Sequence, residues 1–236
     1  SRITHLHKLP PARRKTLAIA FGEIIETLSN RSFVSLFAAA LIGAIASGVV
    51  TSLSLYFFTY FWEFTEEQTG VIFLGTFVAA IIGFILAPIV SKTIGKKRGA
   101  MIVGLIAFGG APVPIILRLF DLLPPNGTPF IFWFVTITNV IDIGLIVTFQ
   151  ILFASMLADL AEESELRTGR RSEGVFTASE TFISKCVQGF GVMTATLVLT
   201  LANIPAGADV ENVPAEAVQR LGLYYVPLVL FLYLFM

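Results

Sequence analysis

The chain has 236 residues, of which 56% are hydrophobic and 14% charged, and its 16 basic residues balance its 16 acidic residues. Soluble domains are about 45–50% apolar and about 25% charged, so this composition excludes an ordinary water-soluble domain as well as a disordered chain. The zero net charge gives no sign of nucleic-acid binding. A single cysteine, Cys186, excludes a disulfide framework, and the only two histidines, His5 and His7, argue against a histidine-based metal centre.

Six apolar runs follow one another along the chain. A membrane-spanning helix needs about 20 apolar residues, and a segment in lipid must satisfy its own backbone hydrogen bonds by being helical. The first five runs reach this length, and the sixth is expected to be cut short. The expected spans are 33–61, 70–90, 99–120, 129–158, 175–203 and 221–236. The sequence therefore predicts an all-α polytopic membrane protein, here as a piece of a longer chain, with the transmembrane bundle over 33–236.

The segment 1–32 precedes the first span and is polar by comparison. Within it, residues 13–28 predict an amphipathic helix on the membrane surface. Between the later spans, 159–173 predicts a charged loop. The segment 203–220 predicts a polar loop that could include a short helix from Pro214.

The basic residues are unevenly divided between the two sides that this topology defines. Thirteen lie in 1–32, 91–98 and 159–173, two are Arg118 and Arg220, and Lys185 lies within a span. Because cytoplasmic loops are enriched in Lys and Arg, the first three segments are predicted to be cytoplasmic. The acidic residues Glu63, Glu66, Glu67, Asp121, Asp209, Glu211 and Glu216 then lie outside.

Two charged residues lie deep within predicted spans, and intramembrane charges usually mark function. Asp142 is placed near the middle of the fourth span and Lys185 near the middle of the fifth, so an ion pair between them is possible. Lys185 could instead snorkel toward the interface, and Asp142 could be a purely structural partner.

Three spans carry polar stripes, which suggests a shared aqueous cavity. Such stripes can also be hydrogen bonds between helices, and this reading stays open. Tyr56, Tyr60 and Trp62 are placed where an outer aromatic belt would lie. The stripes are Ser47, Thr51 and Ser54; Thr138, Asn139, Asp142 and Gln150; and Thr177, Glu180, Thr181, Ser184, Lys185 and Gln188.

No enzyme motif is found, since the sequence lacks HExxH, GxSxG and a P-loop. Asp159, Glu162, Glu163 and Glu165 form an acidic run without the pattern of a metal-binding loop. We interpret that run as charge balance for Arg167, Arg170 and Arg171 at the membrane surface. Neither catalytic nor metal-ligating residues are predicted.

Several motifs resemble those of the glycoside–pentoside–hexuronide:cation symporters, the melibiose-permease-like branch of the major facilitator superfamily. Residues 158–174, with the basic stretch RTGRRSEG, followed by Lys185 are similar to that family's loop between helices 10 and 11 and the mid-membrane lysine of helix 11. The stretch SKTIGKKR over 91–98 is similar to the superfamily's basic loop between helices 8 and 9. LYFFTY over 55–60 and NRSF over 30–33 resemble the end and the entry of helix 7.

The resemblance implies the C-terminal six-helix half, helices 7–12, with helix 12 truncated. It also implies a coupling Na⁺ or H⁺, bound mainly by an N-terminal half that is missing here, and no other cofactor. Lys185 would lie near the cation and sugar sites. Gln150 occupies a helix 10 position where the melibiose permease carries a Trp near its sugar, and the acidic run lacks that protein's Tyr-Gly pair, so the sugar contacts differ.

The function predicted from the sequence is cation-coupled symport of a sugar or glycoside across the cell membrane by alternating access. One alternative is a cation-coupled carrier of a lipid or other small metabolite, and another is a non-transporting receptor or scaffold. Expected partners are the small-molecule substrate, the coupling cation, the lipid bilayer and the missing half. The predicted cavity residues are Lys185, Asp142, Gln150, Asn139, Thr181 and Gln188. The predicted cytoplasmic gate residues are Asp159, Glu162, Arg167, Arg170, Arg171, Glu173, Lys96 and Arg98.

Overall fold

The computed structural model describes residues 31–168, 173–204 and 213–234. Within these residues the chain is helical, and they form no strand. The elements are α2 (Arg31–Tyr56), the π-helix η1 (Phe57–Phe61), α3 (Glu66–Thr93), α4 (Lys96–Gly110), α5 (Val113–Leu119), α6 (Pro129–Thr168), α7 (Glu173–Ala202) and α8 (Ala215–Leu234). The predicted surface helix over 13–28 and most of the segment 1–32 lie outside the described residues.

Five stretches of the described helices are long and apolar enough to cross a membrane, which confirms the predicted class of fold. The fifth predicted span, 175–203, coincides with α7, whose described apolar part is Gly189–Ala202. The five stretches are Phe37–Phe61, Glu66–Thr93, Lys96–Leu119, Pro129–Asp159 and Ala215–Leu234.

Three boundaries differ from the sequence-based prediction. The third span is interrupted, because α4 ends at Gly110 and α5 begins just after Pro112. The segment predicted as a loop from residue 159 is helical as far as Thr168, where α6 ends after 40 residues. The last helix begins directly after Pro214 and reaches 20 residues, so it is long enough to span although its apolar run alone is short.

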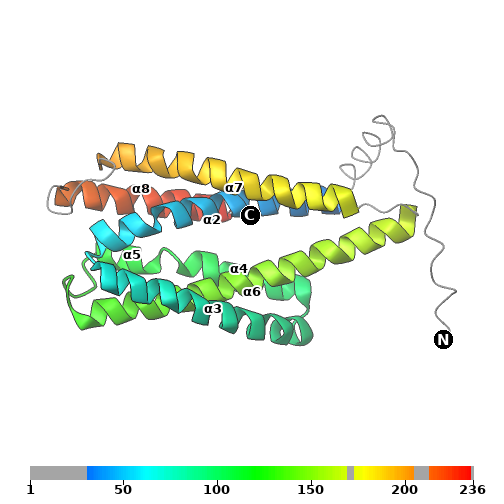
Figure 1. Ribbon diagram of the computed structural model, residues 1–236, viewed down its shortest axis with the longest axis horizontal. Coiled ribbons are helices and arrows are strands. Elements are labelled where there is room, and N and C mark those ends of the chain that lie inside the picture. Colours follow the sequence, from blue (N-terminus) through cyan, green and yellow to red (C-terminus); the bar gives the residue numbers. More distant parts are fainter. Residues whose placement is uncertain (1–30, 169–172, 205–212, 235–236) are drawn as a thin grey trace.

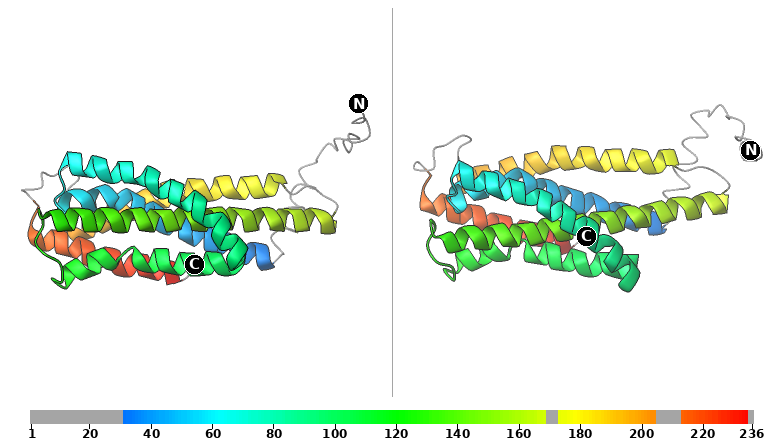
Figure 2. Two further views of the ribbon diagram at one scale, coloured as in Figure 1. Left: turned by 90° about the horizontal axis from the view of Figure 1, so that it is seen from below. Right: turned by 60° about the horizontal axis from the view of Figure 1, so that its bottom comes forward.

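The helices form two groups that lie against each other along their length (Figure 1). In one group α3 and α4 both pack on α6, and in the other α2 packs on α7 with α8 beside them. The turned views in Figure 2 show α3 crossing α6, and α8 lying beside α4. Contacts of α8 with α4 and α5 join the two groups, whereas α6 and α7 contact each other little.

The contact between α3 and α6 is formed by small residues. A Cβ atom added to Gly83 would lie 2.6 Å from the Cβ of Val147, and one added to Gly75 would lie 2.9 Å from Val140 Cγ2. Gly144 faces the backbone of Ala79 just as closely from the other helix, at 3.3 Å. Small residues allow membrane helices to approach at backbone distance, so this interface positions α6 firmly on α3.

In the second group α2 and α7 cross at two glycines. A Cβ atom on Gly191 would lie 2.6 Å from the carbonyl carbon of Gly48, where only backbone could yield. Nearer the start of α7, the rings of Phe37 and Phe182 stack with centroids 6.3 Å apart. The two helices are therefore held together both at a close crossing and by an aromatic pair.

The best-packed core lies near the η1 end of the molecule and is rich in aromatic residues. Tyr60 and Trp62 belong to it, with 7% and 2% of their surface exposed. This corrects the expectation of an outer aromatic belt for these two residues, because belt side chains face the lipid headgroups. Phe57 packs on Tyr225 of α8 at a centroid distance of 4.6 Å, which ties η1 to the last helix.

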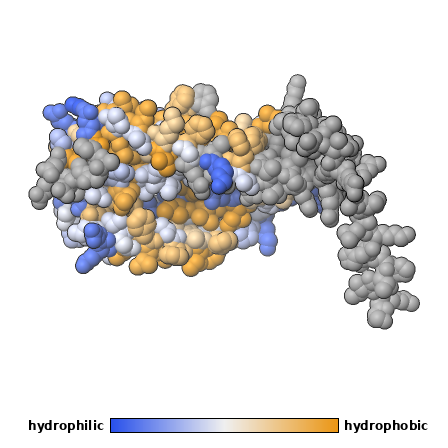
Figure 3. Space-filling model, turned by 45° about the horizontal axis from the view of Figure 1, so that its top comes forward, coloured by the Kyte–Doolittle hydropathy of each residue, from blue (hydrophilic) through white to orange (hydrophobic). Residues whose placement is uncertain are grey.

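The outer surface between the ends is largely apolar, but hydrophilic residues are exposed along the side of the molecule as well as at its ends (Figure 3). We name the two ends by their charges. The basic end carries Arg31, Lys92, Lys96, Lys97 and Arg98, together with the last turns of α6 and the start of α7. The acidic end carries Glu63, Glu66, Glu67, Asp121 and Glu216.

Candidate functional site

At the basic end, two of the predicted gate residues form an ion pair. The Lys96 Nζ atom donates to both carboxylate oxygens of Asp159, at 2.8 and 2.6 Å. Lys96 is the first residue of α4, which follows α3 after a turn of two residues at Ile94 and Gly95, and Asp159 lies on the extended part of α6. The ion pair thus joins residues that are 63 positions apart in the sequence.

The other predicted gate residues are only partly placed. Arg98 and Glu162 are exposed at the same end of the molecule. Arg167 lies in the last turn of α6 and Glu173 is the first residue of α7, and their side chains lie outside the described part of the chain. Arg170 and Arg171 fall outside the described residues altogether.

Asp142 lies within α6 on the face that turns away from α3. Gly144, two residues later, contacts α3, whereas Val135, seven residues earlier, is buried in the core shared with α8. Because residues seven apart share one face of a helix, Asp142 continues that face. Its Oδ1 atom is buried and has no hydrogen-bond partner among the described residues.

Lys185 lies on α7, in the other group of helices, and is exposed. Among the described residues no ion pair within 4.0 Å joins it to Asp142. The two charges therefore belong to helices that contact each other little, and the predicted pair is not closed in this structure.

The remaining predicted cavity residues follow α6 and α7. Asn139 is half-buried one turn before Asp142, and Gln150 is exposed further along α6. Thr181 is exposed on α7 one turn before Lys185, and the side chain of Gln188 lies outside the described residues. On α6, the hydroxyl of Thr138 donates to the carbonyl of Phe134 at 2.8 Å, so part of the predicted polar stripe serves its own helix.

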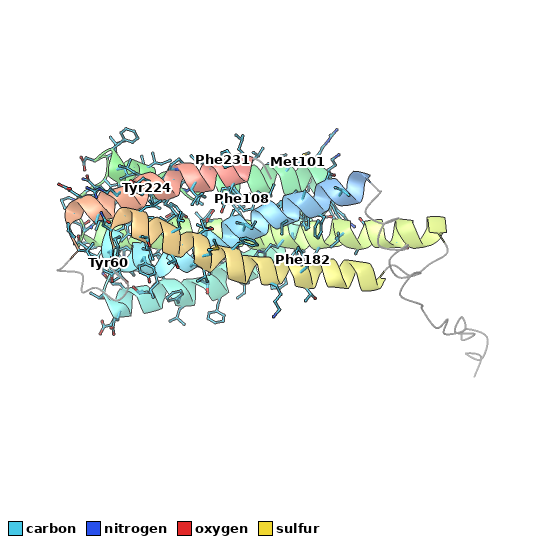
Figure 4. All side chains as sticks on the ribbon, turned by 90° about the horizontal axis from the view of Figure 1, so that it is seen from above. Tyr60, Met101, Phe108, Phe182, Tyr224 and Phe231 are labelled. Atoms are coloured by element: carbon cyan, nitrogen blue, oxygen red, sulfur yellow. The ribbon has the colours of Figure 1, made fainter. Side chains whose placement is uncertain are left out.

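The structure adds two residues that the sequence reasoning did not single out. Tyr225 and Tyr233 of α8 lie within electrostatic reach of Asp142, and Tyr225 is buried. Tyr233 stacks on Phe108 of α4 at a centroid distance of 4.3 Å. Figure 4 shows Phe108 directed into the bundle beside α8, whereas Met101 and Phe231 point outward. The signal for this cluster was Tyr225, a polar aromatic residue in the middle of an apolar helix, followed two turns later by Tyr233 in the last turn of α8.

No group of three His, Cys, Asp or Glu side chains in the described ranges is arranged as metal ligands would be.

The comparison with protein families is decisive for the class of protein. The family described as MFS/sugar transport protein matches residues 2–236. The chain belongs to this family. The described helices that are long and apolar enough to span a membrane fit an integral membrane protein of this family.

Two curated relatives agree with this assignment. A protein named as an uncharacterized symporter of Synechocystis sp. is 25% identical over 202 residues, which is 86% of this chain. A protein named isoprimeverose transporter, from Lactiplantibacillus pentosus, is 28% identical over 180 residues, which is 75% of this chain. The matched region is 34% of the length of each relative. No solved structure matches the chain.

Proposed function

We propose that this chain is the C-terminal six-helix part of a cation-coupled symporter for a sugar or glycoside. The family match over 2–236 is the observation that carries this proposal. One relative is named as a symporter, which supports cation coupling, and the other as an isoprimeverose transporter, which supports a sugar or glycoside as the substrate. The Oδ1 atom of Asp142 is buried and has no hydrogen-bond partner among the described residues. Ionisable residues within membrane-spanning helices are rare and usually have a function, so this atom supports the proposal.

The orientation that we propose places the basic end in the cytoplasm, because Lys and Arg accumulate on that side of membrane proteins. The membrane is a cell membrane, and 91–98 and 159–173 face the cytoplasm together with 1–32. The Lys96–Asp159 ion pair then belongs to a cytoplasmic gate. Arg98, Glu162, Arg167, Arg170, Arg171 and Glu173 complete this gate.

Transport would proceed by alternating access, in which helix groups rock about a site near the membrane midplane. In this chain the two groups contact each other mainly through α8, and α6 and α7 contact each other little. Asp142 and Lys185, on α6 and α7, are therefore the charges whose separation would change when the groups rock. A pair that closes in one state and opens in the other biases the equilibrium between them. Asn139, Gln150, Thr181 and Gln188 complete the proposed cavity around them.

Lys185 provides the first test in the complete transporter. Lys185→Ala should abolish uptake coupled to a cation gradient, because the cavity loses the charge that faces the coupling ion. Arg220→Ala is the control, since this cation lies near the acidic end and is bonded to Glu216 within its own helix. Uptake by Lys185→Ala with unchanged cation dependence would contradict the role of Lys185. Activity of the double exchange Asp142→Lys with Lys185→Asp, when both single exchanges are inactive, would support contact between them.

Counterflow in liposomes separates the alternatives. Vesicles that contain the complete protein and unlabelled isoprimeverose or another glycoside should accumulate the radiolabelled sugar. Counterflow of a lipid or other metabolite, but of no sugar, would favour the second transport function. No counterflow of any compound, together with no thermal shift on adding these compounds, would favour a receptor or scaffold.

A further inference from the structure

The Asp142 carboxylate on α6 has one buried oxygen and interacts electrostatically with two tyrosines of α8, and it forms no ion pair within the described ranges. The Oδ1 atom of Asp142 is buried and accepts no hydrogen bond from any described residue. An ionised carboxylate in such surroundings is so costly that the group instead takes up a proton or binds a cation. Asp142 therefore needs a ligand in at least one state of the protein.

Aromatic contacts enclose this position along the helix axis in both directions. Phe149 follows Asp142 by two helical turns, about 10 Å along α6, on the same face. Its ring contacts Phe108 of α4 at 5.2 Å, and Phe108 stacks on Tyr233. Toward the acidic end, Tyr225 of α8 packs on Phe57 at 4.6 Å. Asp142 thus lies between two aromatic contacts that both involve α8.

The groups that face Asp142 are few. Tyr225 and Tyr233 on α8 are the titratable side chains within its electrostatic reach. On α7, Lys185 is exposed and forms no ion pair with Asp142 in the described part of the chain. The ionisable residues of the neighbouring helices α2, α3, α4 and α5 lie near the ends of those helices. They are Arg31, Glu66, Glu67, Lys92, Lys96, Lys97, Arg98 and Arg118.

This composition favours a proton over a metal cation. A sodium or divalent ion needs several oxygen ligands, and hard cations are bound by groups of carboxylates and carbonyls. Around Asp142 the structure offers one carboxylate, the amide of Asn139 one turn away and two tyrosine hydroxyls, so only one of these groups can carry a negative charge at neutral pH. The nearby hydroxyl of Thr138 is already bonded to its own helix. A single carboxylate of this kind can hold one proton without further ligands.

We propose that Asp142 is a proton-binding site within this six-helix part. When the proton leaves, the hydroxyls of Tyr225 and Tyr233 donate hydrogen bonds to the carboxylate. The proposal identifies H⁺ as an ion bound by this part of the transporter. Only its role in transport rests on the proposed function. The step is the reversible conversion of the carboxylate and one proton into the neutral carboxylic acid, exchanged with water when the helix groups separate.

A chemical test does not depend on transport. Dicyclohexylcarbodiimide reacts with protonated carboxyl groups in apolar surroundings, and the modified residue can be found by peptide mass spectrometry. In the complete protein Asp142 should be labelled at low pH and progressively less as the pH rises. Tyr233→Phe keeps the stacked ring but removes one hydroxyl, so labelling should persist to higher pH. Absence of labelling at every pH would overturn the proposal, and so would Na⁺ protecting Asp142 at constant pH, which would assign sodium to the site.

A transport measurement then tests coupling. Asp142→Asn mimics the protonated acid and can no longer release a proton, so it should lose accumulation driven by a pH gradient. Asp121→Asn is the matched control, because Asp121 is an exposed aspartate in a loop at the acidic end. Undiminished accumulation by Asp142→Asn would overturn the proposal. If the wild-type protein shows no sugar counterflow at all, the proposed function fails, while the labelling result still decides whether Asp142 binds a proton.

Discussion

At the scale of single residues, the described charges fall into two kinds. Those at the ends are largely exposed, and two ion pairs form among them, between Lys96 and Asp159 and between Arg220 and Glu216. Asp142 is different, because its buried oxygen has no partner in the described part of the chain. Exposed pairs contribute little to stability, whereas a buried unpaired oxygen is costly and is kept for a reason other than stability.

The Lys96–Asp159 pair should therefore act on conformation more than on stability. The two side chains are 37% and 57% exposed. A double-mutant cycle with Lys96→Ala and Asp159→Ala should give a coupling energy of about 0.2–1 kcal/mol in thermal or chemical unfolding. Arg98→Ala, an exposed neighbour on α4, is the control and should show no coupling to Asp159→Ala. A coupling of several kcal/mol would mean that the pair is far less solvated than the structure shows.

At the scale of helices, small residues determine which helices pair. Gly191 and Gly48 meet at backbone distance where α7 crosses α2, and Gly83 meets Val147 where α3 crosses α6. These contacts build the two helix groups, and α8 joins them through its contacts with α4 and α5. The site residues are then distributed between groups, with Asp142 on α6 and Lys185 on α7.

A methyl group at Gly191 should disturb this arrangement. In Gly191→Ala the new Cβ would lie 2.6 Å from the backbone of Gly48, and no flexible side chain can move aside. We expect a loss of about 1–3 kcal/mol in unfolding free energy, the usual effect of overpacking. Gly189→Ala, two residues earlier on the same helix, has nothing within 4 Å of its new Cβ and should be neutral or slightly stabilising. Equal stability of the two variants in detergent would contradict the crossing.

The sequence predicted the spans well because lipid requires long apolar helices, and hydropathy alone reveals them. It missed the helical course of α6 beyond residue 159, although ADLAEESELR over 158–167 is rich in strong helix formers. The basic charge of Lys96 and the acidic charge of Asp159 were both recognised, but their contact depends on how α4 and α6 pack. The burial of Tyr60 and Trp62 and the approach of Tyr225 and Tyr233 to Asp142 also depend on packing, which hydropathy does not encode.

At the scale of the whole molecule, the zero net charge conceals an uneven division of the basic residues, most of which, among those described, lie at one end, whereas acidic residues lie at both ends. The apolar surface between them is suited to a bilayer, and the two helix groups meet along the part that the bilayer would surround (Figures 1 and 3). In the function that we propose from the family match, this architecture serves transport. Two groups joined mainly through one helix can change their relative position without unfolding either group.

The central claim is cation-coupled sugar symport. The most direct test is to record the electrical current across a supported membrane that contains the complete transporter. Adding isoprimeverose or another transported glycoside to one side, without any ion gradient, should produce a transient current, because each sugar carries a cation across. The current should disappear in Lys185→Ala and in Asp142→Asn. Sugar counterflow by the same preparation without any current would show uncoupled transport and would contradict the account.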